Sequence, residues 1–187
     1  MATLSWILLS SRLPREPSRL RLAIWRRLKR LGAILVHDAV WMLPADAKTR
    51  EAFEWLAEEI EEQGGTAWVW EAVGLSPAQD REAVEQFRRE ADRRFAEIGA
   101  SATAIRDAAL RGRRRGRRAR PHSSADLAHA VRQLRGLEHA LRLERRRDYF
   151  RAGGRAAAAA LVSEAITGLE GRWPAPQTDR TARALGD

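Results

Sequence analysis

Cysteine is absent from the whole sequence. This absence excludes disulfide bonds, thiolate catalysis, zinc-finger sites and thiol redox sensing. Long apolar runs are also missing: no stretch approaches the length of roughly 18 residues that a transmembrane helix needs. The apolar stretch at residues 6–9 is too short for the core of a signal peptide and has no basic residues before it. We therefore expect a cytoplasmic protein without a membrane anchor.

Basic residues are in excess, and lysine is scarce among them. The formal net charge is +9, and Lys29 and Lys48 are the two lysines among 34 basic residues. A charge of this sign favours a polyanionic partner. Arginine suits bidentate contacts with phosphate, although a G+C-rich genome produces the same bias. Both explanations of the arginine excess remain open.

The N-terminal part of the chain has the periodicity of an α+β domain. Apolar spacing predicts six elements in the order strand, helix, two-strand hairpin, helix, strand. They are Leu4–Leu13, Arg19–Leu31, Ala33–Val36, Val40–Pro44, a helix from Asp46 or Thr49 to Gln63, and Thr66–Ala72. The order βαββαβ is typical of a ferredoxin-like domain. We expect such a domain over residues 1–75, with one face of its sheet under two helices and the other face open.

The remaining residues predict a helical extension over residues 76–170. Its expected helices are residues 77–99, Ser101–Leu110, a long helix from Ser124, and Arg155–Leu169. An arginine-rich linker is expected at residues 111–121, and a disordered tail at 171–187. The helix from Ser124 has apolar residues at steps of three and four, a short heptad pattern. These residues are Leu127, Ala130, Leu134, Leu137 and Leu141.

Two groups of basic residues are candidates for contact with nucleic acid. The first lies on the helix Arg19–Leu31, opposite its apolar stripe and without an acidic residue in between. The second is the run from Arg111 to Arg120, in which seven of ten residues are arginine. The alternatives are a solvated helix face and a solvated linker. The predicted DNA-contacting residues are Arg15, Arg19, Arg26, Arg27, Lys29, Arg30, Arg113, Arg114, Arg115, Arg117 and Arg118.

The tryptophans and histidines are expected to have structural roles and not catalytic or metal-binding ones. Trp68 and Trp70 share one side of the last strand, where packing in the core or at an interface is favoured over stacking on bases. Trp25 and Trp55 are expected in the core. His37 beside Asp38 is the one candidate acid–base pair, and no nucleophile accompanies it. No histidines have the i, i+4 spacing of a helical metal site. We therefore expect no cofactor, no metal and no enzymatic activity.

Three segments resemble one protein family. They are residues 24–44, reading IWRRLKRLGAILVHDAVWMLP, together with residues 49–56 and 63–65. Together they resemble the N-terminal region of the ChrB family of chromate-resistance regulators, and Arg145–Phe150 is similar to the segment that closes this region. The resemblance implies a bacterial transcription regulator of chromate-efflux genes that binds DNA and responds to chromate. In outline the domain is also similar to the ferredoxin-like domain of PaaX-type repressors. Longer family members carry a second, C-terminal domain.

The leading prediction is thus a DNA-binding transcription regulator. We expect a homodimer, formed through the open sheet face, the heptad residues or both. Without thiols, chromate as an effector would be held by arginine pairs or backbone amides. The alternatives are an accessory protein or enzyme of chromate tolerance, either a reductase or nuclease-like, and a partner of a separately encoded second domain.

Overall fold

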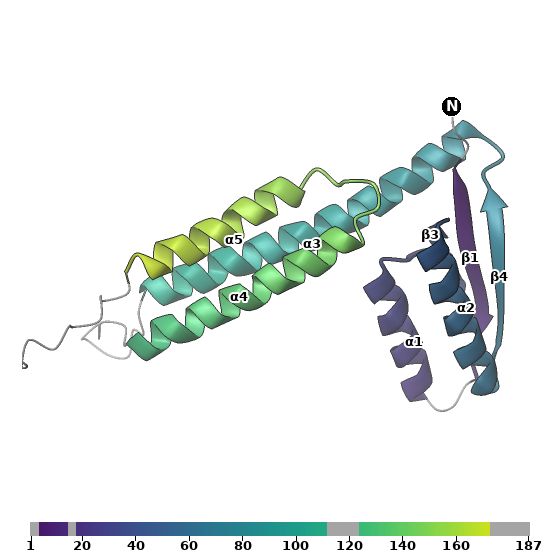
Figure 1. Cartoon of the computed structure of the whole chain (residues 1–187), viewed down its shortest axis with the longest axis horizontal. Helices are drawn as coiled ribbons and strands as arrows, with labels where there is room; N and C mark the ends of the chain where they lie inside the picture. Colours follow the sequence, from purple (N-terminus) through teal and green to yellow (C-terminus); the bar gives the residue numbers. More distant parts are fainter. Residues whose placement is uncertain (1–3, 15–17, 112–123, 173–187) are drawn as a thin grey trace, which may run out of the picture. The chain divides into compact units, whose positions relative to one another are not determined.

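The computed structural model describes residues 4–14, 18–111 and 124–172 (Figure 1). Within these residues the fold is α+β, with one four-stranded antiparallel sheet and five helices. No described helix is both long enough and apolar enough to cross a membrane. The elements are β1 (Ser5–Arg12), α1 (Ser18–Leu31), β2 (Ile34–His37), β3 (Val40–Pro44), α2 (Ala47–Glu62), β4 (Thr66–Val73), α3 (Pro77–Arg111), α4 (Ser124–Arg146) and α5 (Arg155–Glu170).

The chain divides into two compact units. The first contains residues 1–94 and 143–153, and the second contains residues 95–142 and 154–187. The boundary between the units falls inside α3, so the first unit also contains the start of α3. The first unit therefore combines the sheet, α1, α2 and a segment from much later in the chain.

The sheet of the first unit has the strand order β2-β3-β1-β4, with β1 and β3 in the middle. Along β1, Ile7 lies opposite Leu43 of β3 on one side and opposite Glu71 of β4 on the other. Ile7 and Leu43 are buried in one cluster with the apolar residues of α1 and α2. The predicted elements of this region are thus confirmed to within two residues, because their periodicity already showed which side of each was apolar.

The opposite face of the sheet was predicted to be open, but part of it is covered. Trp6 of β1 stacks on Phe87 of α3 with ring centroids 5.9 Å apart, and Phe150 packs against both rings. The indole Nε1 of Trp6 donates a hydrogen bond to Asp80 Oδ1 at 3.0 Å. The start of α3 therefore covers the part of this face around Trp6. Helical periodicity revealed that α3 has an apolar side, but not which surface that side covers.

The second unit contains parts of α3 and α4 together with α5. The break predicted at Gly99 is wrong, because α3 continues without interruption to Arg111. Gly99 is buried, and a Cβ atom on it would lie 2.8 Å from Leu161 Cδ1 of α5. This glycine permits close helix packing, which offsets its low helix propensity. The heptad residues Leu127 and Leu134 are buried in the same unit's core, so their apolar side is occupied within the chain.

Trp25 and Trp55 do not lie in the core, and that prediction is wrong. Trp25 is 48% exposed and Trp55 is 62% exposed. Trp55 follows the buried Phe53 by two positions, about 200° around the helix, which turns its ring away from the sheet. The position of an aromatic residue near the apolar stripe of a helix was thus not enough to predict that its side chain is buried.

The depth of burial on α2 predicts opposite results for two neighbouring aromatic residues. Phe53 is fully buried, so Phe53→Ala should lower the free energy of unfolding by about 3–5 kcal/mol. Trp55→Ala removes a larger side chain from the same helix, yet should change stability by about 0.5 kcal/mol or less. Urea unfolding followed by circular dichroism measures both. Equal losses in the two variants would show that the assigned faces of α2 are wrong.

Candidate nucleic-acid interface on α1

The outer side of α1 carries a stripe of three arginines. The buried residues of this helix are Ile24 and Leu28. Arg19, Arg26 and Arg30 follow one another by seven and four positions, which places them on the side opposite to the core. All three are exposed, and no acidic group of the described residues forms an ion pair with them. We call Arg19, Arg26 and Arg30 the arginine stripe.

Two other predicted contact residues of α1 are already paired. Arg27 forms an ion pair with Glu59 of α2. Lys29 Nζ lies 3.8 Å from Glu90 of α3 and 5.8 Å above the ring centroid of Trp41. These two charges are therefore balanced by carboxylates from distant segments, and contact of Arg27 and Lys29 with nucleic acid stays a prediction. Partly exposed pairs of this kind contribute about 0–1 kcal/mol each.

The other predicted contact residues lie outside the described residues. They are Arg15, Arg113, Arg114, Arg115, Arg117 and Arg118. Their roles stay predictions, and the arginine stripe is the part of the proposed interface that the structure describes.

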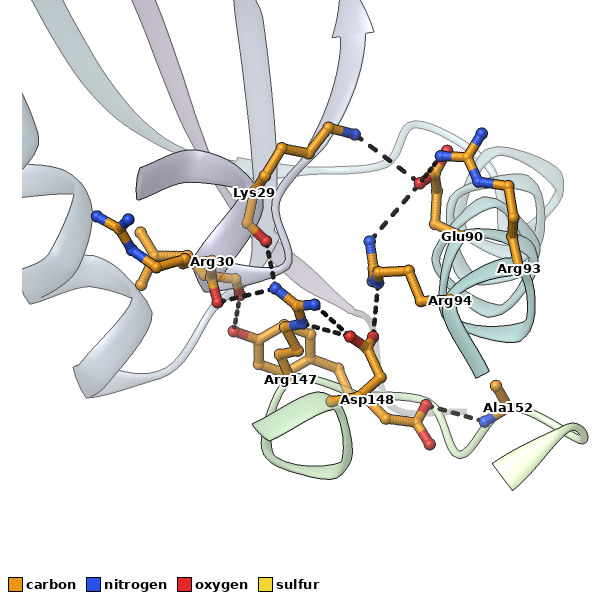
Figure 2. Close-up of polar contacts among 11 residues, drawn as sticks. Lys29, Arg30, Glu90, Arg93, Arg94, Arg147, Asp148 and Ala152 are labelled. Carbon is orange, nitrogen blue, oxygen red and sulfur yellow. Dashed lines mark hydrogen bonds and ion pairs between the residues drawn. The ribbon is translucent and has the colours of Figure 1, made fainter. Parts of the chain in front are cut away.

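The C-terminal end of α1 is held by a segment from much later in the chain (Figure 2). Arg147 Nη1 donates a hydrogen bond to the carbonyl oxygen of Lys29 at 2.7 Å, and the Tyr149 hydroxyl donates one to Leu31 O at 2.8 Å. These carbonyls belong to the last turn, which has no partners within the helix. A guanidinium there also balances the negative end of the helix dipole. The stripe is therefore carried by a helix whose end is fixed.

Gly32 allows this approach. It ends α1 with φ +77°, as the sequence predicted for the residue after the helix, and this is a conformation that favours glycine. A Cβ atom at this position would lie 3.0 Å from Arg147 Cβ and 3.2 Å from Arg147 O. Gly32 is thus required both for its backbone conformation and for the contact with Arg147.

A buried carboxylate orients Arg147. The side chain of Glu144 is 1% exposed and accepts hydrogen bonds from Arg94 Nε at 2.6 Å and from Arg147 Nε at 2.7 Å. Two guanidinium groups thus compensate one buried negative charge. Sequence reasoning assigned no role to Glu144 or Arg147. The sequence pattern that could have indicated this pair is a glutamate three positions before an arginine at the end of a helix. The same spacing is common on solvated helices, so it does not single out a buried pair.

The other candidate site residues do not form a reactive group. His37 Nε2 lies 3.8 Å from Asp38 Oδ2, and both side chains are more than 80% exposed. Among the described residues no three histidine or acidic side chains are placed to hold a metal ion. A shallow groove of about 730 Å³ beside the arginine stripe is lined mainly by apolar residues, including Leu22 and Trp25. The arginine stripe is consequently the feature with the clearest potential for binding.

The role of Arg147 predicts a large loss of stability on its removal. Arg147→Leu leaves a buried carboxylate with one partner and removes the guanidinium donor from the carbonyl of Lys29, which should cost about 3–5 kcal/mol. Arg145→Leu makes the same change at an exposed neighbouring residue and should cost about 0.5 kcal/mol or less. Chemical unfolding of both variants measures the difference. A loss below about 1 kcal/mol for Arg147→Leu would contradict the assigned role.

The hydroxyl that contacts α1 predicts a pH effect. Burial, reinforced by Asp46, raises the pKa of Tyr149 to about 12. Above pH 10 the unfolded chain loses this proton while the folded chain keeps it, so stability should fall between about pH 10 and 12. Tyr149 is the one tyrosine of the chain, so absorbance of tyrosinate near 295 nm reports it directly. A midpoint near 10 in the folded protein would contradict the burial, and Tyr149→Phe serves as the blank.

Comparisons with known proteins show which family this chain resembles. The family described as Protein ChrB, N-terminal, matches residues 21–173, a range that contains most of α1 and the Arg147–Tyr149 segment. Protein ChrB from Cupriavidus metallidurans is 29% identical over 85 residues, which are 46% of this chain and 26% of that protein. The chain thus matches about a quarter of the length of this relative. No solved structure matches the chain significantly. A family match over most of the residues shows that the chain belongs to the ChrB N-terminal domain family.

Proposed function

We propose that this protein is a DNA-binding transcription regulator of chromate-resistance genes that contacts DNA through α1. The proposal rests on the arginine stripe: three exposed guanidinium groups without carboxylate partners in the described residues, on a helix fixed at its end by Arg147. Membership of the ChrB family supports the link to chromate resistance. In this proposal the protein acts in the cytoplasm by binding and not as an enzyme.

The dimensions of the stripe suit duplex DNA. Arg19 and Arg30 are eleven positions apart, which corresponds to about 16 Å along a helix. That length is roughly half of one turn of DNA, and a major groove about 12 Å wide admits one helix. Three phosphate contacts per protein chain would give a slope of about −3 in log K against log salt. A slope steeper than this for each bound protein chain would indicate that further basic residues, such as those of the run 111–120, also contact phosphate.

We also infer that the sheet domain is of the ferredoxin-like type. In the described strands, β1 and β2 have β3 between them, and β3 and β4 have β1 between them. This is the split arrangement of two interleaved βαβ halves. This arrangement supports a ferredoxin-like domain. Each βαβ half leaves a gap between its two strands, and a strand of the other half fills that gap.

A response to chromate is the further part of this proposal and is supported by the family alone. The chain has no thiol, so an oxyanion would be bound by guanidinium groups or backbone amides. Arginines on α1 would then serve both ligands, and chromate at millimolar concentration would compete with phosphate for them.

The decisive variant reverses two charges of the stripe. Arg26→Glu combined with Arg30→Glu lowers the net charge from +9 to +5 and should abolish binding to DNA from the promoter region of the chromate-resistance genes. The matched control, Arg132→Glu combined with Arg142→Glu on α4, makes the same change in net charge at two other exposed arginines. It should retain binding to within about threefold at moderate salt, by the additivity of phosphate contacts.

Gel shift and fluorescence anisotropy give the affinities, and circular dichroism shows whether each variant is folded. Retained binding by the folded Arg26/Arg30 variant would overturn α1 as the contact surface. Equal losses in both double variants would show that total charge, and not the stripe, determines binding.

A further inference from the structure

Strand β4 lies at one edge of the sheet that the described strands form. It pairs with β1 over eight residues, from Thr66 to Val73, with no register shift, and no described strand lies on its other side. The edge therefore presents a regular row of backbone donors and acceptors. Edge strands are usually protected by proline, lysine or a bulge. The sequence of β4, TAWVWEAV, contains neither residue, and its pairing with β1 shows no bulge.

The same strand carries an exposed aromatic pair. Trp68 is 65% exposed and Trp70 is 53% exposed, and their rings meet edge to face with centroids 5.9 Å apart. At about 250 Å² for each side chain, the two leave roughly 300 Å² of mostly apolar surface in water. Leu75, which is 96% exposed, follows shortly after the strand, whereas Val73 points to the other face of the sheet. An exposed aromatic pair of this area is a candidate interaction site.

The charges on this strand favour a protein over a nucleic acid as the partner. Tryptophans that stack on bases are normally accompanied by basic residues that follow the phosphates. The one charged residue of β4, Glu71, points to the other face of the strand and pairs with Arg50 of α2, so no basic residue of β4 accompanies the two tryptophans. A free edge of unpaired backbone groups instead fits another strand.

We propose that β4 pairs in antiparallel fashion with β4 of a second copy, with Val69 on the two-fold axis. In an antiparallel pair, opposite residues point to the same face of the sheet, so this register follows from the tryptophans. It places Trp68 opposite Trp70 of the second copy, and Trp70 opposite its Trp68. Two cross-strand aromatic pairs then cover each other, which is a favourable pairing in sheets. Glu71 lies opposite Ala67, so that the carboxylates of the two copies do not face each other.

The pairing has two consequences for the whole assembly. The two four-stranded sheets become one sheet of eight strands, and both α1 helices lie on the same side of it, because α1 and α2 cover the same face. Two stripes related by a two-fold axis suit a palindromic DNA site. This arrangement is separate from DNA binding itself, since it involves no residue of the arginine stripe.

A salt effect distinguishes the dimer from the DNA complex. Helix α2 packs over β4, as the Arg50–Glu71 pair shows, and carries six glutamates against two basic residues. Pairing of two β4 strands brings two acidic helices closer together. Added salt screens this repulsion, so association of two copies should strengthen with salt, whereas DNA binding should weaken.

Sedimentation equilibrium of the full chain without DNA tests the proposal. The wild type should be a dimer, and Trp68→Ser combined with Trp70→Ser should weaken dimerisation by on the order of 30-fold or more. Trp55→Ser, which removes another exposed tryptophan, should leave the dimer unchanged.

Disulfide cross-linking tests the register. Because the chain lacks cysteine, Val69→Cys should form a disulfide-linked dimer on mild oxidation. Thr66→Cys, on the same strand but about 20 Å from its copy in this register, should not.

Each contrary outcome is informative. A monomeric wild type, a dimer that withstands loss of both tryptophans, or equal cross-linking of Val69→Cys and Thr66→Cys would overturn the pairing of β4. Loss of binding to single-stranded DNA in the Trp68/Trp70 variant of a monomeric protein would instead identify a base-stacking surface. The Arg26/Arg30 variant should remain dimeric. If β4 does not pair with a second copy, the proposal that α1 binds DNA is unaffected. If α1 does not bind DNA, the proposed dimer is unaffected.

Discussion

The capping of α1 by Arg147 is the interaction on which the proposed site depends. A helix rich in cations gains little from its own side chains, because like charges repel and its last carbonyls lack partners. Arg147 and Tyr149 donate hydrogen bonds to two of those carbonyls, and both residues come more than 100 positions after α1 in the sequence. Glu144 accepts hydrogen bonds from both Arg147 and Arg94, so one buried carboxylate offsets part of the two positive charges at this end of α1. The exposed arginines are therefore presented on a helix whose end is fixed by ion pairs with a buried carboxylate.

Charge is separated between the two helices that cover the sheet. Helix α1 has no acidic residue, and α2 has six glutamates. The Arg27–Glu59 pair joins the two helices on their facing sides and removes one cation from the outer surface. What remains exposed is a cationic side on α1 and an anionic side on α2. A phosphate chain would thus be attracted to one helix and repelled by its neighbour, which gives an incoming duplex a preferred orientation.

The two faces of the sheet serve different purposes. One face is filled by α1 and α2 around Ile7, Leu9 and Leu43, and this provides most of the apolar core of the first unit. On the other face, the Trp6–Phe87–Phe150 cluster extends the core towards α3, while Trp68 and Trp70 of β4 are more than half exposed. An aromatic pair beside a free edge combines apolar area with unpaired backbone groups. These two properties favour a second strand over a small molecule.

The sequence by itself determined the elements of the sheet domain, the end of α1 at Gly32 and the resemblance to a family, because each depends on local periodicity or on a local motif. It also predicted that Arg19, Arg26 and Arg30 lie on the outer side of α1, because the helical repeat places them opposite the apolar Ile24 and Leu28. Only the tertiary structure decided which cations stay free, because Arg27 and Lys29 pair with Glu59 of α2 and Glu90 of α3, both distant in the sequence. The same holds for the continuation of α3 through Gly99, the exposure of Trp25 and Trp55, and the burial of Glu144. In each of these cases the deciding neighbour lies on another element, and a local pattern contains no information on which distant segment will come to lie against it.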